Sequence, residues 1–344
     1  MAKVHFATSV WRRMSGWQKA GVSLVALLGV LCAAGVTLGI GLKHRYESRV
    51  QREDILGHGT APRDDERWNS GPLNLLLLGS DSRAGEADEG LYPGQRSDTI
   101  MLVHLNATRD TATVVSIPRD SYVEVPARSG SWPGGLNKIN AAFAFGGASL
   151  AAETVHKLTG ATIDGVLVAN FAAVRQIVDA IGGVTVCLPY VVISTDTGTR
   201  WQVGCHQLDG RNTDDLMRQR HNVPGGDFGR IQTQQLVVRA IVEKITAENL
   251  LTDPARLDRV LTTTAESLTV DRELDIAELV LAVRRITTAS LRFVTVPAAE
   301  TDLMTPAGSS VQLDERLSMS LFAALREDRL DEWFASQPAT SIPD

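Results

Sequence analysis

Three short apolar runs follow one another in the first half of the chain and limit the folds that it can adopt. The segments LNLLLLG (73–79), TIMLVHL (99–105) and TATVVSI (111–117) are bounded by Gly, Asp or Pro. They are hydrophobic without a clean alternation, which is typical of strands buried on both faces of a sheet. VTVCLPY (184–190) and LRFVTVPA (291–298) have the same character. A sheet covered on both faces requires helices on either side of it.

Helical patterns lie between these runs. Asn170 is expected to cap a helix that stops at Gly182 and Gly183. Further helices are expected over 148–159, 230–248, 254–268, 274–287 and 315–327. Strands interleaved with helices predict an α/β fold, here a layered α-β-α domain around a central mixed sheet.

The segment from Ala20 to Leu42 contains no charged residue. Its 23 residues would cross the hydrocarbon layer of ~30 Å as a helix. We interpret it as one N-terminal transmembrane helix. A cleavable signal peptide is the alternative, although the apolar region of such a peptide is usually only ~7–15 residues long. Four Lys or Arg precede the segment and four follow it, so charge does not fix its orientation.

The formal charge of −6 is unevenly distributed. Residues 1–52 hold eight Lys and Arg against one Glu, which gives +7 and leaves −13 for the remainder. An acidic body argues against a nucleic-acid partner, because nucleic-acid binding needs a basic face. A site for an anion must therefore be a local cluster of arginines.

Cys187 and Cys205 are the only cysteines outside the apolar N-terminal segment. They could be inert core residues. A single pair that flanks a short insertion is also typical of a disulfide in an oxidising compartment, and we favour the disulfide.

Polar clusters stand where the expected buried strands end, the usual place for a site in such folds. Asp81 and Arg83 lie in GSDSR after the first strand, Asp98 lies in RSDT at the start of the second, and Arg119 lies in SIPRD after the third. Taken singly, each has an ordinary explanation as a turn residue, a helix cap or a surface ion pair.

A fourth cluster is more informative. Arg218 and Arg220 are two residues apart and would share one side of an extended chain. Arg230 and Gln234 are four residues apart near the start of an expected helix, and so share one face. Buried polar groups need partners, and a helix N-terminus favours an anion.

Several arginines with two aspartates indicate a phosphate ligand and a divalent cation. Arginine binds phosphate with two parallel hydrogen bonds, and carboxylates together with phosphate oxygens hold Mg²⁺. The sequence has no Walker P-loop, no G-x-G-x-x-G after a strand, no G-x-S-x-G and no H-E-x-x-H. Those nucleotide-binding, hydrolase and zinc-protease chemistries are therefore not indicated.

Eight motifs in order resemble the LytR-CpsA-Psr family of cell-wall glycopolymer ligases. They are GSDSR, RSDT, SIPRD, KINAAFAFGG (138–147), IGGVTV (181–186), LDG (208–210), RQRH (218–221) and GDFGRI with QQ (226–235). The resemblance runs from about Leu73 to Phe334. The insertion between Cys187 and Cys205, together with RQRH, is similar to actinobacterial members.

The resemblance implies binding of a polyprenyl-pyrophosphate-linked glycan and transfer of its glycosyl 1-phosphate to a hydroxyl of peptidoglycan. It implies Mg²⁺ or Mn²⁺ at Asp81 and Asp98. The residues that it and the spacing assign to the pyrophosphate are Arg83, Arg119, Arg218, Arg220, Arg230 and Gln234. Asp81, Asp98, Arg119 and Arg218 are the expected catalytic residues. One departure is Thr233, because the family commonly has Arg at that position.

The resemblance also implies a single-pass protein of the cell membrane with an extracytoplasmic catalytic domain. The expected organisation is a cytoplasmic N-terminus (1–19), the transmembrane helix (20–42), a linker (43–70), the catalytic domain (71–336) and a C-terminal tail (337–344). Two alternatives stay open: transfer of the glycan to a surface protein, and a non-catalytic regulator that binds the lipid-linked glycan.

Overall fold

The computed structural model describes residues 50–57, 68, 70–80, 97–220, 223–248, 250, 253–264 and 267–337. The chain divides into two compact units, Met1–Arg49 and Val50–Asp344. The first unit, with the expected transmembrane helix at 20–42, lies outside the described residues. Within the described part, no helix combines the length and the apolar character needed to cross a membrane.

A seven-stranded mixed sheet forms the centre of the second unit. Its order is β1 (Gln51–Glu53), β12 (Leu268–Asp271), β7 (Gly165–Asn170), β2 (Leu73–Ser80), β3 (Ser97–Leu105), β4 (Ala112–Ser116) and β13 (Leu291–Thr295). β2 runs parallel to β7 and antiparallel to β3, and β4 runs antiparallel to β3 and parallel to β13. The expected mixed sheet is confirmed.

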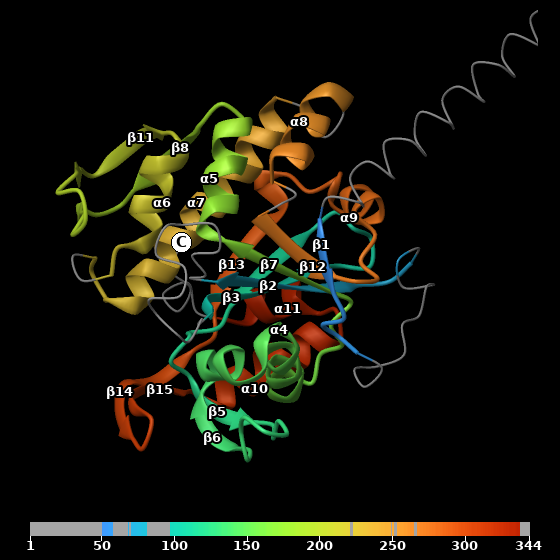
Figure 1. Cartoon of the computed structure of the whole chain (residues 1–344), viewed down its shortest axis with the longest axis vertical. Helices are drawn as coiled ribbons and strands as arrows, with labels where there is room; N and C mark the ends of the chain where they lie inside the picture. The colour runs from blue at the N-terminus through green and yellow to red at the C-terminus, as the bar shows by residue number, and fades with distance from the viewer. Residues whose placement is uncertain are drawn as a thin grey trace, which may run out of the picture. The chain divides into compact units, whose positions relative to one another are not determined.

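Helices cover both faces of this sheet, as Figure 1 shows. They are α4 (Ile139–Thr159), α5 (Phe171–Ala180), α6 (Gly210–Arg218), α7 (Asp227–Ala247), α8 (Pro254–Thr264), α9 (Ile276–Val283), α10 (Glu315–Arg326) and α11 (Leu330–Ser336), with a 3₁₀ turn η3 (Thr288–Ser290).

Alternate residues of β2 divide the core into two layers. Leu76 and Leu78 pack with α4, α10 and α11 on one face. Leu73 and Leu75 pack with α7 and α9 on the other. Because successive side chains of a strand point to opposite faces, a continuously apolar strand supplies both layers. The layered α-β-α architecture is therefore confirmed.

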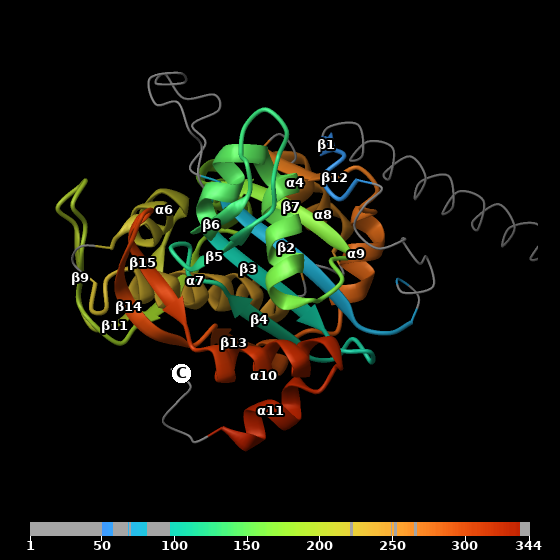
Figure 2. The same cartoon turned by 90° about the horizontal axis from the view of Figure 1, so that it is seen from below.

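The described residues of this unit also form four two-stranded hairpins (Figures 1 and 2). They pair β8 (Val184–Leu188) with β11 (Gly204–Leu208), β9 (Val192–Ile193) with β10 (Arg200–Trp201), β5 (Tyr122–Val125) with β6 (Gly135–Lys138), and β14 (Ala298–Thr305) with β15 (Gly308–Leu313). The β8–β11 hairpin packs with α5, α6 and α7 around a third apolar cluster that includes Val186, Leu216 and Val237.

The structure corrects the prediction that 184–190 forms a strand buried on both faces. β8 lies outside the central sheet, and its residues alternate between buried and exposed. Val184, Val186 and Leu188 face the third cluster, whereas Thr185 and Cys187 face solvent. Only one face of β8 is covered because the strand has a single neighbouring layer.

Two helix predictions also need correction, and one helix was missed. The helix expected from residue 148 is preceded by a helical segment from Ile139, with non-helical backbone at Gly146 and Gly147 between the two parts. α7 begins at Asp227, three residues before the expected start. The helix α6 was not predicted. The helix after Asn170 is confirmed, since the Asn170 side chain accepts a hydrogen bond from Ala173 N at 2.9 Å.

Candidate active site

Five charged residues meet where β3 begins, β4 ends and α7 begins. We call Asp98, Arg119, Asp120, Asp227 and Arg230 the charged cluster. The Arg119 guanidinium donates to the Asp98 carboxylate through Nη1. Its Nε lies 3.2 Å from Asp227 Oδ1 and 3.4 Å from Asp120 Oδ2. Three carboxylates therefore surround one guanidinium group.

The antiparallel pairing of β3 and β4 explains why these residues meet. It places the start of β3 beside the end of β4, and the ladder continues with Ile117 N donating to Ile100 O at 2.9 Å. Pro118 ends the strand, and its carbonyl accepts from both N and Oγ of the fully buried Ser121. The turn closed by Ser121 fixes Arg119 at the edge of the sheet.

Arg230 enters the charged cluster from α7. Its residue is only 4% exposed, and its Nη2 lies 2.7 Å from Asp227 Oδ1 and donates to Asp98 O at 3.3 Å. A Cβ at Gly229 would lie 2.1 Å from the carbonyl oxygen of Pro224. Glycine at position 229 is therefore required for the tight packing that sets the first turn of α7.

Burial and neighbouring charges act in opposite directions on the two guanidinium groups. Burial lowers the pKa of Arg119, but the carboxylates of Asp98, Asp227 and Asp120 outweigh burial and raise that pKa above its ordinary value. Burial lowers the pKa of Arg230, which Asp227 only partly offsets. Both groups remain cationic because the ordinary pKa of arginine is so high.

Several buried polar atoms of this region have no hydrogen-bond partner within the described part of the chain. They are Arg119 Nε, Arg230 Nε, Gln234 Nε2 and Asp227 Oδ1, four of the seven such atoms in the described residues. Asp227 Oδ1 is close to both arginines, but the alignment is not that of a hydrogen bond. Since unsatisfied buried groups cost ~1–3 kcal/mol each, their concentration here indicates a site built for a ligand.

A second pair of arginines lies at the end of α6. Arg218 is the last residue of this helix, so the prediction that Arg218 and Arg220 share one extended segment is wrong at Arg218. Arg218 Nε donates to Asp214 Oδ1 at 2.6 Å, and Asp214 Oδ2 lies 3.7 Å from Arg175 Nη1 of α5. Arg220 is exposed, and its charge lowers the pKa of Arg230 as a minor contribution after burial. Arg220 thus adds positive charge near Arg230, whereas Arg218 is paired with Asp214.

Thr233 stands at the position where the family commonly has arginine, and it makes a neutral contact there. Thr233 is fully buried, and its Oγ1 lies 3.1 Å from the hydroxyl of Tyr190, which follows β8. Tyr190 also donates to Gly229 O at 3.0 Å. Thr233 therefore joins α7 to the β8–β11 hairpin and does not extend toward the charged cluster.

Two of the predicted site residues, Asp81 and Arg83, lie outside the described residues. Asp98, Arg119 and Arg230 come together, and Gln234 stands one turn after Arg230 on α7. Within the described residues, no group of three or more His, Cys, Asp or Glu has the arrangement of a metal site.

Sequence reasoning missed four residues near Arg119. Asp120 Oδ1 lies 3.3 Å from Lys138 Nζ and 3.4 Å from Asn140 Nδ2, and Asp227 approaches both arginines. All four occur within the motifs SIPRD, KINAAFAFGG and GDFGRI. The available signal for Asp120 and Asp227 was the position of acidic residues near arginines in SIPRD and GDFGRI.

Cys187 and Cys205 form a disulfide in the structure. They stand opposite each other in the antiparallel register of β8 and β11, and both are exposed. The bond therefore closes the insertion on the outer face of the hairpin, away from its apolar face.

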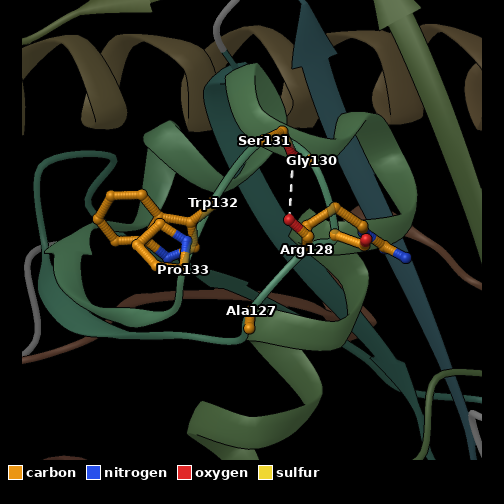
Figure 3. A pocket seen from close by; sticks show the side chains of 7 residues that line it. Ala127, Arg128, Gly130, Ser131, Trp132 and Pro133 are labelled. Atoms are coloured by element: carbon orange, nitrogen blue, oxygen red, sulfur yellow. Dashed lines mark hydrogen bonds between the residues drawn. The ribbon is translucent and has the colours of Figure 1, made fainter.

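A hollow of about 460 Å³ lies at the tip of the β5–β6 hairpin (Figure 3). It is lined by the loop 127–133, whose Trp132 stacks on Phe145 of α4 with ring centroids 4.5 Å apart. Arg128 Nη2 donates to Ser149 Oγ at 3.2 Å. No residue of the charged cluster lines this hollow, so the candidate site is the cluster itself.

A layered fold with buried guanidinium and amide nitrogens that lack a hydrogen-bond partner at the edge of its sheet defines an α/β protein with a candidate anion-binding site. A model of the LytR_cpsA_psr family matches residues 44–326. The chain belongs to this family, the LytR-CpsA-Psr family.

Known relatives agree with this assignment. The chain is 33% identical over 207 residues to the polyisoprenyl-teichoic acid–peptidoglycan teichoic acid transferase TagU of Enterococcus faecalis, covering 60% of this chain and 64% of that protein. It is 33% identical over 262 residues to the probable cell wall biosynthesis protein LcpB of Corynebacterium glutamicum, covering 73% and 61%. The chain thus spans less than two thirds of either relative.

A solved structure shows the same fold. Protein gbs0355 of Streptococcus agalactiae superposes with a TM-score of 0.67 at 22% sequence identity, covering 78% of this chain and 91% of that one. At this level of identity the likeness is evidence for the architecture alone.

Proposed function

We propose that this protein transfers a glycosyl phosphate from a polyprenyl-pyrophosphate carrier to a hydroxyl of peptidoglycan. The observation that carries the proposal is the set of buried donors without a hydrogen-bond partner among the described residues, Arg119 Nε, Arg230 Nε and Gln234 Nε2. They need an acceptor-rich anion, and a phosphate group fits them best. The family membership and the teichoic acid transferase among the relatives support the same substrate class.

The reaction is a phosphoryl substitution. The oxygen of the acceptor hydroxyl bonds to the phosphorus that carries the sugar, and the bond from that phosphorus to the bridging oxygen breaks. The bridging oxygen leaves with the electron pair as polyprenyl phosphate, and the hydroxyl proton passes to a base. Negative charge grows on the leaving phosphate, and fixed cations aimed at it lower the barrier.

The residues of the candidate site have different proposed roles, according to their positions. Arg119 and Arg230 bind the pyrophosphate oxygens, and Gln234 donates a further hydrogen bond from the same helix face as Arg230. Arg218 and Arg220 add positive charge from the end of α6, and Arg83 is assigned to the same group from the sequence. Because Arg119 and Arg230 are held by carboxylates, they are oriented before the donor arrives.

The charge of the cluster supports a divalent cation. Asp98, Asp120 and Asp227 contribute three negative charges and Arg119 and Arg230 two positive ones, and the neighbouring Lys138 brings the balance to zero. A pyrophosphate diester brings about two negative charges that this neutral group does not offset.

We therefore assign Mg²⁺ or Mn²⁺ to Asp98 together with Asp81. Carboxylate oxygens are the ligands that such hard cations prefer, and Asp227 Oδ1 is a buried oxygen with unused acceptor capacity. A bound cation would supply positive charge beside the phosphate oxygens of the donor.

The same proposal includes the location of the protein. We infer a single-pass membrane protein anchored by residues 20–42, with the domain that carries the charged cluster outside the cytoplasm. The exposed Cys187–Cys205 disulfide supports this side of the membrane, because exposed disulfides persist mainly in oxidising compartments. A membrane-impermeant protease added to intact cells should remove the domain, and protection of the domain would refute the orientation.

Transfer is tested with the full-length chain in detergent, a synthetic lipid-linked glycan as donor and peptidoglycan fragments as acceptor. Release of polyprenyl phosphate together with a new phosphodiester on peptidoglycan is the expected result. If the glycan were transferred only to a surface protein, the proposed acceptor would change from peptidoglycan to that protein. Donor binding without transfer in the presence of Mg²⁺ would refute catalysis and leave a regulator that binds the donor.

A further inference from the structure

The insertion between β8 and β11 contacts the C-terminal end of α6 at Asp215 and Gln219. The Cys187–Cys205 bond closes this insertion, which contains β9 and β10. Directly after β9, the turn Ser194–Thr197 reaches the end of α6. The insertion is therefore attached to the residues that precede and separate Arg218 and Arg220.

Gln219 is the central residue of this attachment. It is only 2% exposed, and both ends of its amide are hydrogen bonded. Nε2 donates to Asp215 Oδ1 at 2.8 Å and to Asp215 O at 2.9 Å, and Oε1 accepts from Thr195 N at 2.9 Å. Gln219 thus links α6 to the insertion through a buried, satisfied side chain.

Asp215 completes the attachment without a cationic partner among the described residues. Its Oδ1 accepts from Ser194 Oγ and its Oδ2 from Thr197 Oγ1, both at 2.6 Å. The side chain is 9% exposed, so these neutral donors are what satisfies a buried carboxylate. Loss of one of them would disturb the whole group, because buried polar networks act together.

The backbone geometry shows what the attachment controls. α6 ends at Arg218, and Gln219 turns the chain out of the helix with φ −70° and ψ 131°. The side chain of Gln219 points into the insertion, while Arg218 pairs with Asp214 and Arg220 is exposed. Holding Gln219 fixes the direction in which the chain leaves α6, and with it the place of Arg220.

We propose that Gln219 is a positioning residue that fixes Arg220, and through the end of α6 also Arg218, for the phosphates of the donor. The proposal rests on the proposed function, because it assigns these arginines to the donor phosphates. It makes the disulfide-closed insertion a part of the donor site, although none of its own residues need touch the donor.

The test measures binding of farnesyl pyrophosphate with Mg²⁺ to the full-length protein in detergent by calorimetry. Gln219→Met should raise the Kd about tenfold, within the range for directly coupled residues. Gln207→Met is the matched control, since Gln207 is exposed on β11 of the same hairpin, and it should leave the Kd unchanged. Thermal unfolding of each variant shows whether the fold is retained.

A double-mutant cycle separates positioning from a general structural role. If Gln219 acts through Arg220, Gln219→Met should cause no further loss in the Arg220→Ala background. Fully additive losses would overturn the inference. Should Gln219→Met fail to fold, Ser194→Ala loosens the same attachment from the insertion and must show the same coupling to Arg220.

The outcomes distinguish the two proposals. The donor site is supported if the parent protein binds farnesyl pyrophosphate and Arg119→Ala abolishes this binding. If the parent protein does not bind farnesyl pyrophosphate, both the donor site and the inference are refuted. Parent-like binding by Gln219→Met and Ser194→Ala would overturn the inference alone and leave the proposed function standing.

Discussion

Gln234 and Gln235 are adjacent on α7 but have opposite hydrogen-bonding states. Gln234 is 1% exposed, and its Nε2 has no partner among the described residues. Gln235 Nε2 donates to Ser116 Oγ at 2.9 Å and to Thr295 Oγ1 at 3.2 Å, which joins α7 to β4 and β13. If the Gln234 amide binds a ligand and the Gln235 amide stabilises the fold, the same substitution at the two positions should have different effects on stability and on ligand binding.

Gln→Met keeps the length of the side chain and removes the amide. Gln234→Met removes an unsatisfied buried donor, so the free energy of unfolding should stay constant or rise by up to ~1 kcal/mol. Gln235→Met removes two hydrogen bonds and leaves two hydroxyl groups without a donor, which should lower the free energy of unfolding by ~1–3 kcal/mol.

For ligand binding, Gln234→Met should have the larger effect and Gln235→Met the smaller one. A hydrogen bond to a charged group contributes ~1.5–3 kcal/mol, so Gln234→Met should weaken farnesyl pyrophosphate binding by about 10- to 150-fold. Gln235→Met should change it little as long as the protein is folded. Denaturant unfolding followed by tryptophan fluorescence and calorimetric titration measure the two quantities. Equal destabilisation by both substitutions, or unchanged binding in Gln234→Met, would refute the assignment of the Gln234 amide to the ligand.

Three further predictions concern the metal, the disulfide and pH. Asp98→Ala, or excess EDTA with the parent protein, should lower the transfer rate by roughly 10²–10³; transfer at the parent rate in both would exclude the cation. Replacing Cys187 and Cys205 by Ser should lower the free energy of unfolding by ~3 kcal/mol, and intact-mass analysis of unreduced parent protein should find no alkylated thiol in this pair. Burial raises the pKa of Tyr190, so the folded state disfavours its phenolate. The stability gained from the neutral phenol should be lost as pH rises above about 10, a slope that Tyr190→Phe should reduce in denaturant titrations.

The central sheet could be predicted because its middle strands are covered on both sides. Leu76 and Leu75 of β2 serve different layers, so the sequence shows no polar face there. In β8, by contrast, Cys187 was counted as an apolar residue of a continuous run, although it faces solvent in a disulfide. A cysteine does not reveal by its own hydrophobicity which environment it will occupy.

α6 was harder to predict because its sequence GRNTDDLMR has few apolar residues. The Asp209 side chain caps it by accepting from Asn212 N at 2.8 Å, a local signal available in the motif LDG. The buried Asp215 is held by the insertion, and such tertiary partners are not visible in a local pattern.

The arginines of the candidate site were predictable from their positions at strand ends and on one helix face. Their carboxylate partners were not. Asp120 and Asp227 approach Arg119 from two different elements. Asp120 lies in the turn after β4, and Asp227 lies in the first turn of α7. Which acidic residues meet a given arginine depends on how these elements pack, and spacing along the chain does not contain that information.

α7 touches a different neighbour with each of three successive residues. Thr233 contacts Tyr190, Gln234 carries the amide that we assign to the ligand, and Gln235 is hydrogen bonded to the sheet. Consecutive residues of a helix are about 100° apart, so these contacts enclose the helix on three sides. Rotation of α7 about its axis would break the contacts to Tyr190 and to the sheet at once. The orientation of Arg230 and Gln234 is therefore set by contacts that α7 makes on its other sides.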